Sequence, residues 1–286
     1  MGVDLQGIRL LSEYRKNREL GDVVTLGRQG ISLYPEERRE ASREYGISMT
    51  LLENDWSESL LIEHFGAKSV TSIDCSDYEG ATIVHDMNTP VRDMRQFDTV
   101  LDFGTSEHIF DVKTVFGNIK NLCKPGGSII HFLPANNFCG HGFYQFSPIF
   151  FRSLYDEKSG IDIDAMYLAK MATDRDWYRV NAVASMDRFV FYNDYPTTIL
   201  VITTKRGGSE KVSVQQTDYL NRWEGNDAGV NLRENQGLRK IKYLLLNNGL
   251  RRTFEILESL YRKVRPYHGY SSRLDGSPYV VKDNMK

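Results

Sequence analysis

Short apolar runs that end in polar residues or glycine recur along the first half of this chain and alternate with helix-forming stretches. The strand-like runs lie at 22–27, 68–77, 81–88, 97–108 and 128–134. Helical spacing or cap signals occupy 3–20, 36–46, 57–67 and 111–123. Parallel strands need a crossover connection, which is usually a helix. The alternation therefore predicts an α/β fold, with helices covering the faces of a parallel sheet.

The same pattern continues to residue 206 and then stops. The runs 161–172 and 197–206 are strand-like, whereas 237–267 has the pattern of two basic helices. We therefore predict an α/β domain over 1–206 and a C-terminal helical extension over 207–286. The extension would pack on the domain or form a homodimer.

Composition and charge narrow the class of protein. The chain is 41% hydrophobic and 26% charged with a net charge of −2, so nothing in its overall charge favours nucleic acid or an anionic membrane. We find neither a membrane-spanning apolar run nor the apolar core of a signal peptide. The three cysteines are far apart, which is unlike a disulfide framework or a zinc cluster. A cytoplasmic protein without nucleic-acid or membrane partners is expected.

Polar residues gather where the predicted strands end, and ligands of open α/β sheets bind at that edge. The first strand ends in "LGRQG" (26–30), whose glycines let backbone approach a ligand closely. Asp74 ends the second strand and can accept hydrogen bonds from both hydroxyls of a ribose. Asp86 can accept from an exocyclic amine, and Met87 can pack on a flat ring. The fourth strand end, "DFGTSEH" (102–108), offers partners for a charged amino-acid group.

Together these features resemble a class I S-adenosylmethionine-dependent methyltransferase of the small-molecule, type 11-like kind. The most specific part is "FDTVLDFGTSEHIFD…LCKPGGSIIHFLP", and the resemblance covers about 22–206. It implies a Rossmann-like three-layer sandwich with a seven-stranded, mostly parallel sheet, and S-adenosyl-L-methionine as cofactor. The cofactor-binding residues it implies are Gly27, Arg28, Gln29, Asp74, Cys75, Tyr78, Asp86, Met87, Asp102, Gly104 and Thr105.

The resemblance also implies roles for these residues. Gly27 would line the methionine part and Asp74 the ribose, while Asp86 and Met87 would meet the adenine. Residues 102–105 would form the floor beneath the sulfonium.

The first motif departs from the family pattern of an acidic residue followed by G-x-G-x-G. Thr25 stands near the acidic position of "TLGRQG", so Asp102 or Glu107 would supply the charge for the cofactor amine. The long gap before Asp74 suggests that 31–55 forms a lid over the cofactor. From Asp74 to Asp86 the chain is too short for a crossover helix, which predicts a loop.

The stretch "PANNFCGHGFYQFSP" (134–148) follows the fifth strand and therefore lies at the ligand edge. Methyl transfer to a hydroxyl needs a group that accepts its proton, and histidine suits that role near neutral pH. We predict His141 as this base, with His108 as its rival and Tyr144 beside them. The predicted substrate-binding residues are Glu107, Asn136, Asn137, Gln145, Trp177 and Arg179.

Two of these assignments had alternatives. Glu107 and His108 resemble part of a cation site in some related O-methyltransferases, but Gly104 stands where a further carboxylate would be needed. One Glu and one His are too few, so no metal is predicted. Trp177 and Arg179 fall in a predicted substrate insertion over 173–195, or else in a surface turn anchored by one aromatic.

The function these features predict is methyl transfer to a small polar acceptor, a hydroxyl of a sugar or polysaccharide precursor, with a His general base. The first alternative is a non-catalytic methyltransferase-like binding or assembly subunit, which the incomplete first motif favours. The second is a Rossmann-type dehydrogenase, although the G-x-G-x-x-G fingerprint is missing.

Overall fold

The computed structural model describes residues 2–171, 176–180, 190–192, 194–207, 214, 256, 271–273 and 280–283. Contacts divide the chain into two compact units. The first comprises Met1–Val180, Tyr195–Val214 and Asp283–Lys286, and the second comprises Asn181–Asp194 and Gln215–Lys282. Nearly all described residues belong to the first unit, which contains every predicted site residue.

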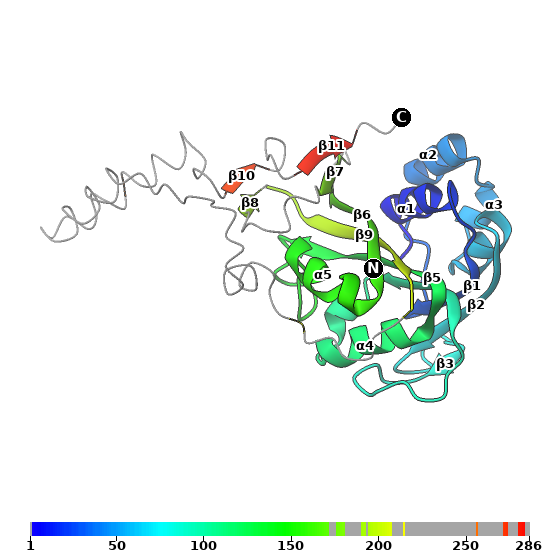
Figure 1. Cartoon of the computed structure of the whole chain (residues 1–286). Coiled ribbons are helices and arrows are strands. Elements are labelled where there is room, and N and C mark those ends of the chain that lie inside the picture. The colour runs from blue at the N-terminus through cyan, green and yellow to red at the C-terminus, as the bar shows by residue number, and fades with distance from the viewer. Residues whose placement is uncertain are drawn as a thin grey trace, which may run out of the picture. The chain divides into compact units, whose positions relative to one another are not determined.

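A twisted sheet forms the centre of the first unit (Figure 1). Its strands are β1 (Gly21–Leu26), β2 (Ala67–Asp74), β3 (Ile83–Val84), β4 (Phe97–Phe103), β5 (Cys123–Asn136), β6 (Ile161–Lys170), β7 (Trp177–Val180) and β9 (Thr197–Lys205). They lie in the order β7-β6-β9-β5-β4-β1-β2-β3. β1 to β5 pair in parallel, whereas β9 runs antiparallel to both β5 and β6. The carboxyl ends of β1, β2 and β4 therefore meet at one edge.

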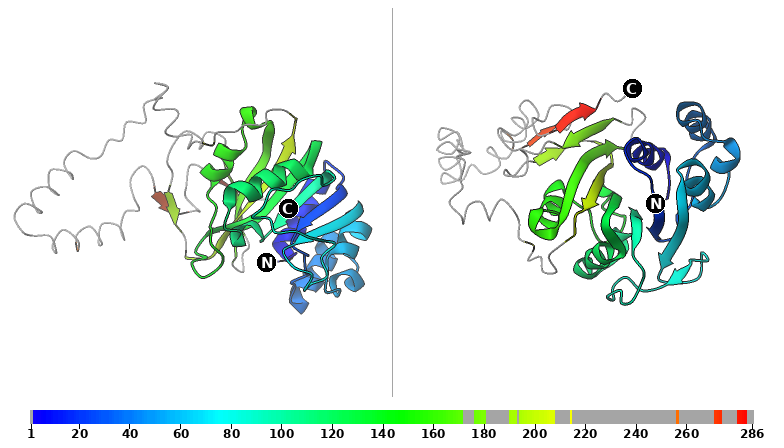
Figure 2. Two further views of the ribbon diagram at one scale, coloured as in Figure 1. Left: turned by 90° about the horizontal axis from the view of Figure 1, so that it is seen from below. Right: turned by 45° about the vertical axis from the view of Figure 1, so that its right-hand side comes forward.

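Helices cover both faces of this sheet (Figure 2). The helical elements are α1 (Leu5–Arg15), α2 (Pro35–Tyr45), α3 (Met49–Leu52), the π-helical η1 (Leu60–His64), the 3₁₀ turn η2 (Ser106–His108), α4 (Val112–Leu122), α5 (Pro148–Leu154) and the 3₁₀ turn η3 (Glu157–Ser159). α1, α2, α3 and η1 lie on one face, and α4 and α5 lie on the other. The predicted Rossmann-like α/β sandwich is confirmed.

Alternation along the central strands decides which face each side chain reaches. On β4 and β5, Leu101, Phe103, Ile130 and Phe132 belong to the large core shared with α1. The residues between them point the opposite way, toward α4 and α5. His131 is one of these, and its ring lies 5.0 Å from that of Phe151 on α5.

The strands predicted from the sequence are all present, with two differences. β3 is only two residues long, and the predicted loop connects it to Asp74. β5 already begins at Cys123, because residues 124–127 form an irregularity within the strand rather than a turn before it.

Among the described residues, the sheet of the first unit has the eight strands given above, one more than the seven predicted. The reason is that Trp177–Val180 form β7, inside the segment predicted as a substrate insertion. The rest of that insertion lies largely outside the described residues.

Little of the second unit is described. β8 (Val190–Tyr192) pairs in parallel with β10 (Ser271–Arg273), and β11 (Val280–Asp283) is the last strand of the chain. The helices predicted over 237–267 fall outside the described residues, apart from Ile256, which is helical. No described helix is long and apolar enough to cross a bilayer.

Candidate functional site

The turn after β1 brings three strand ends together at Gly27. Its φ of 69° lies in the left-handed region, and its N–H donates to the Ile73 carbonyl at 2.7 Å. A Cβ at this position would lie 3.0 Å from Thr105 Oγ1 and 3.8 Å from Asp74 Oδ2. We call Gly27, Gln29, Asp74 and Thr105 the Gly27 cradle. Its glycine keeps open a space that a side chain would fill.

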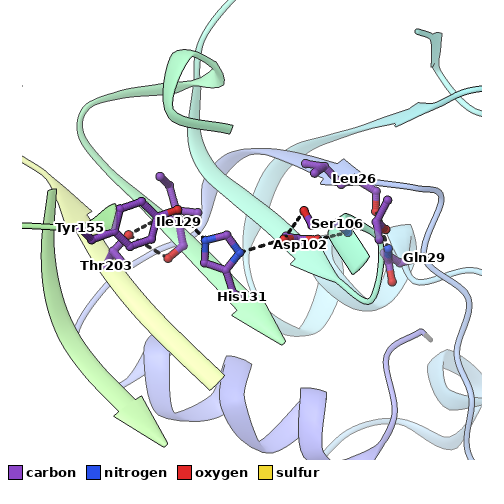
Figure 3. Close-up of polar contacts among 9 residues, drawn as sticks. Leu26, Gln29, Asp102, Ser106, Ile129, His131, Tyr155 and Thr203 are labelled. Atoms are coloured by element: carbon purple, nitrogen blue, oxygen red, sulfur yellow. Dashed lines mark hydrogen bonds and ion pairs between the residues drawn. The ribbon is translucent and has the colours of Figure 1, made fainter. Parts of the chain in front are cut away.

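Two side chains of the cradle are held by the Leu26 carbonyl, and Figure 3 labels one of them, Gln29. Thr105 Oγ1 and Gln29 Nε2 each donate to Leu26 O at 2.6 Å. Gln29 is 4% exposed, yet its Oε1 accepts no hydrogen bond. Buried carbonyl oxygens are nearly always paired, so this acceptor suits a donor supplied by a ligand.

Two carboxylates lie beyond the cradle, after β2 and β3. Asp74 is half-buried, and its Oδ1 accepts the Cys75 N–H at 2.7 Å. Asp86 is exposed, and its Oδ1 accepts from the Asn88 backbone N–H and side-chain amide at 2.9 and 2.8 Å. These two hydrogen bonds lower the pKa of Asp86. Both carboxylates thus lie at the edge where the sequence predicts them.

Other predicted cofactor residues are placed differently. The Arg28 guanidinium donates to Glu58 Oε1 at 2.7 Å and lies 4.4 Å from the centre of the Trp56 ring, so it is occupied by protein groups. Met87 is 4% exposed and packs in the interior. Tyr78 is 92% exposed, and Cys75 is exposed beside Asp74.

Asp102 lies in the interior of the protein, whereas the sequence predicts it in the floor beneath the sulfonium. Its carboxylate is fully buried and accepts from Ser106 Oγ at 2.7 Å, and its Oδ2 lies 2.9 Å from His131 Nδ1. The other nitrogen of His131 lies 2.7 Å from the Tyr155 hydroxyl, which completes a buried polar chain (Figure 3). Asp102 therefore anchors the start of η2, with its carboxylate held by protein groups. Gly104, with φ 76°, makes the turn between Asp102 and Thr105.

This polar chain follows from the strand register. Asp102 and His131 are direct partners in the parallel β4–β5 pair, so both side chains point toward α4 and α5. The His131 ring links the two ends of the chain, because its Nδ1 contacts Asp102 Oδ2 and its Nε2 contacts the Tyr155 hydroxyl. Burial raises the pKa of Tyr155. The sequence reasoning missed Ser106, His131 and Tyr155, although a His within the apolar run "SIIHFLP" was a visible signal.

A second constellation lies just beyond the cradle, on the β4–α4 connection. Glu107 Oε1 lies 3.7 Å from His108 Nε2 and 3.5 Å from His141 Nε2. The two imidazole rings meet edge to face, with centroids 4.9 Å apart. We call Glu107, His108 and His141 the Glu107 cluster. The structure thus brings together both predicted bases and one predicted substrate residue.

The loop of residues 137–147, here the His141 loop, is held on the backbone of Glu107. The Glu107 carbonyl accepts the N–H groups of Phe143 at 2.7 Å and Tyr144 at 3.2 Å. Gly142 has φ 71°, and a Cβ there would lie 2.9 Å from both Glu107 Cγ and Glu107 O. The glycine is therefore required for the close approach that places His141 beside Glu107.

Burial sets the electrostatics of the cluster. It raises the pKa of Glu107 to about 8, with a further contribution from the Asp102 charge. Burial also lowers the pKa of His141. Burial and the neighbouring His141 ring together lower the pKa of His108. Neither Glu107 oxygen nor His141 Nε2 has a hydrogen-bond partner, although these atoms are buried. The cluster is thus a set of polar atoms that the described part of the protein leaves unsatisfied.

Several predicted substrate residues, and Tyr144 of the predicted catalytic set, form hydrogen bonds that hold the His141 loop and its neighbours. Gln145 Oε1 accepts the Phe138 N–H at 2.9 Å, and Asn137 Nδ2 donates to the Tyr195 carbonyl at 2.9 Å. The Tyr144 hydroxyl donates to the Phe110 carbonyl at 2.7 Å, which makes it a loop anchor. Asn136 is the last residue of β5, paired with Thr197.

Trp177, which the sequence predicts to bind a substrate, lies in the core of the protein. It is fully buried, its Nε1 donates to Gln6, and the Arg9 guanidinium lies 4.2 Å from its ring centre. Its large apolar ring fills the core between β7 and α1, so it has no surface for a substrate. Arg179, two residues along β7, is exposed.

Comparison with known proteins gave structural similarity only. No family model matches the chain, and no curated protein matches it. Among solved structures, the chain is similar to the N-methyltransferase NodS from Bradyrhizobium japonicum in complex with S-adenosyl-L-homocysteine. The two sequences are 11% identical, the match covers 71% of this chain and 86% of that chain, and the TM-score is 0.41. It is also similar to a TehB-like SAM-dependent methyltransferase from Corynebacterium glutamicum, with 13% identity, 69% and 86% covered, and a TM-score of 0.39.

Proposed function

We propose that this protein transfers a methyl group from S-adenosyl-L-methionine to a hydroxyl of a small polar acceptor, such as a sugar or polysaccharide precursor. The observation that carries the proposal is the arrangement of the Gly27 cradle and the Glu107 cluster. Thr105 of the cradle and Glu107 of the cluster are two residues apart on one short connection. A cofactor site and an acceptor site would therefore share a boundary at the carboxyl edge of the sheet.

The cradle residues fit this cofactor. The Asp74 carboxylate suits a pair of ribose hydroxyls, and the unpaired Oε1 of Gln29 suits the ammonium of a methionine group. Gly27 allows a ligand to reach the backbone where a Cβ would block it. Asp86, farther along the edge, would accept from an adenine amine.

When bound, the cofactor supplies an electrophilic methyl group on a sulfonium, and the electron pair of the broken C–S bond stays on sulfur. The chain's own residues orient the acceptor hydroxyl and take up its proton. His141 Nε2 has no hydrogen-bond partner among the described residues and is the first candidate to receive that proton, with His108 beside it.

Titration calorimetry tests cofactor binding. We expect S-adenosylhomocysteine to bind the wild-type protein and NAD not to bind. Asp74→Ala should weaken binding about 10- to 100-fold, as expected for a lost hydrogen bond to a charged group. Asp77→Ala, an exposed carboxylate in the same loop, is the matched control. Binding of NAD alone would favour the dehydrogenase alternative, and no binding heat with either compound would reject the proposal.

Transfer of labelled methyl groups to a panel of sugars and nucleotide sugars tests the reaction. His141→Ala should lose turnover while keeping affinity for S-adenosylhomocysteine. Unchanged turnover would remove His141 from the mechanism. Cofactor binding without turnover on any acceptor would support the non-catalytic alternative. The homodimer stays a prediction, which sedimentation can check.

A further inference from the structure

We propose that the Glu107 cluster binds a divalent transition-metal ion through Glu107, His108 and His141. The sequence pattern predicts no metal, because His141 follows the other two residues only after a strand and a helix. The fold brings it back to them, and binding of the ion itself does not depend on the proposed methyl transfer.

The spacing of the three ligand atoms suits one ion. Glu107 Oε1 lies 3.5 and 3.7 Å from the two Nε2 atoms, and all three groups offer a ligand atom within 4.8 Å of the others. Bonds of about 2.1 Å to a tetrahedral ion place neighbouring ligand atoms about 3.4 Å apart. Small rotations of two imidazole side chains would therefore complete the geometry.

Unsatisfied buried atoms are the second observation. Glu107 is fully buried, and both of its oxygens, like Nε2 of His141, have no hydrogen-bond partner. In the part of the chain that the structure describes, the only basic groups within ion-pair distance of Glu107 are the two imidazoles. A buried carboxylate is costly unless it is paired or coordinates a metal. A cation between these three side chains would satisfy all of them at once.

The ligand set indicates the class of metal. Two imidazole nitrogens and one carboxylate suit zinc, iron, cobalt or manganese, whereas magnesium and calcium prefer oxygen ligands. Three protein ligands leave at least one coordination position open. The side chains of His108 and His141 are 46% and 36% exposed, so the open position is accessible from solvent.

The role of the ion rests on the proposed function. An acceptor hydroxyl in the open position would have a lower pKa, because the ion stabilises the alkoxide. The hydroxyl proton would leave to solvent, and the oxygen would take the methyl group. With the ion bound, His108 and His141 would act as ligands that position the hydroxyl, and the ion would replace the role proposed above for His141 as the base.

Cobalt titration tests the site. After treatment with a chelator, the full-length protein should bind one Co²⁺ with visible d–d absorption, and Zn²⁺ should displace it. His141→Gln should weaken Co²⁺ binding about 100-fold, because even an outer-shell change typically costs metal affinity about 10- to 100-fold. His64→Ala, outside the cluster, is the matched control. Glu107→Gln is a second variant, read together with thermal melting because the side chain is buried.

Saturable binding that His141→Gln leaves unchanged would overturn the metal site, as would no binding by the wild-type protein. The two proposals fail separately. Co²⁺ binding without affinity for S-adenosylhomocysteine would reject the proposed function alone. Full turnover after metal removal would reject the role of the ion alone.

Discussion

Replacing Gly142 by alanine tests how the His141 loop is held over Glu107. The residue has φ 71°, and an added Cβ would lie 2.9 Å from Glu107 Cγ, 2.9 Å from Glu107 O and 3.2 Å from Glu107 C. Two of these atoms are backbone, so the clash cannot be relieved by turning a flexible side chain. Gly140 is the matched control, because a Cβ there meets no atom within 4 Å.

The magnitude follows from two contributions. A residue with a Cβ in the left-handed region costs roughly 1–2 kcal/mol. If the loop also loses the hydrogen bonds from Phe143 and Tyr144 to Glu107 O, each adds about 0.5–1.5 kcal/mol. The total for Gly142→Ala is therefore about 2–5 kcal/mol when both bonds break, and about 1–2 kcal/mol when they survive. Gly140→Ala should stay within about 0.5 kcal/mol of wild type.

Amide hydrogen exchange at Phe143 and Tyr144 measures this directly. A cost of one to two kcal/mol lowers protection about 5- to 30-fold, and the larger cost lowers it further. If the loop unfolds with the domain, the melting temperature should fall by about 2–4 °C per kcal/mol. Equal protection in the Gly142→Ala and Gly140→Ala proteins would refute the claim that close backbone approach holds the loop.

Two further predictions concern stability. Tyr155→Phe removes the hydroxyl beside His131 Nε2 and should lower the free energy of unfolding by about 1–3 kcal/mol in urea, more than Tyr144→Phe does; equal losses would contradict the buried polar chain. The Lys124 ammonium and the Asp22 N–H lower the pKa of Asp98, so this stabilisation is present above the ordinary value of 3.8 and is lost as pH falls through the folded-state pKa. Asp98→Asn should therefore flatten the fall in unfolding free energy below about pH 4, and parallel pH curves would contradict it.

Most of the sheet was predictable because each strand carries its own local signal. Apolar runs of strand length, separated by capped helices and glycine stops, indicate parallel βα units without knowledge of any long-range contact. Parallel strands bring their carboxyl ends to one edge, so the places of Gly27, Asp74 and Thr105 followed from the pattern. β7 was not predicted, because its four residues are too few to show the alternation of a strand.

Contacts between segments far apart in the sequence determine the surroundings of the predicted site residues. The side-chain environment of Asp102 depends on its register partner His131, and strand register is a property of two strands together. The sequence allows Trp177 to bind a ligand at the surface, whereas in the structure it packs against Arg9 and donates to Gln6. A single sequence carries no signal for either pairing.

The sequence by itself determined the class of fold and the strand ends that gather at one edge of the sheet, because hydrophobic period and turn chemistry are local. Only the tertiary structure placed His141 against Glu107 and His108. That meeting depends on the His141 loop folding back onto the Glu107 carbonyl, with Gly142 permitting the approach. The sequence shows only a Glu–His pair and a distant histidine, so the cluster of these three side chains could not be read from it.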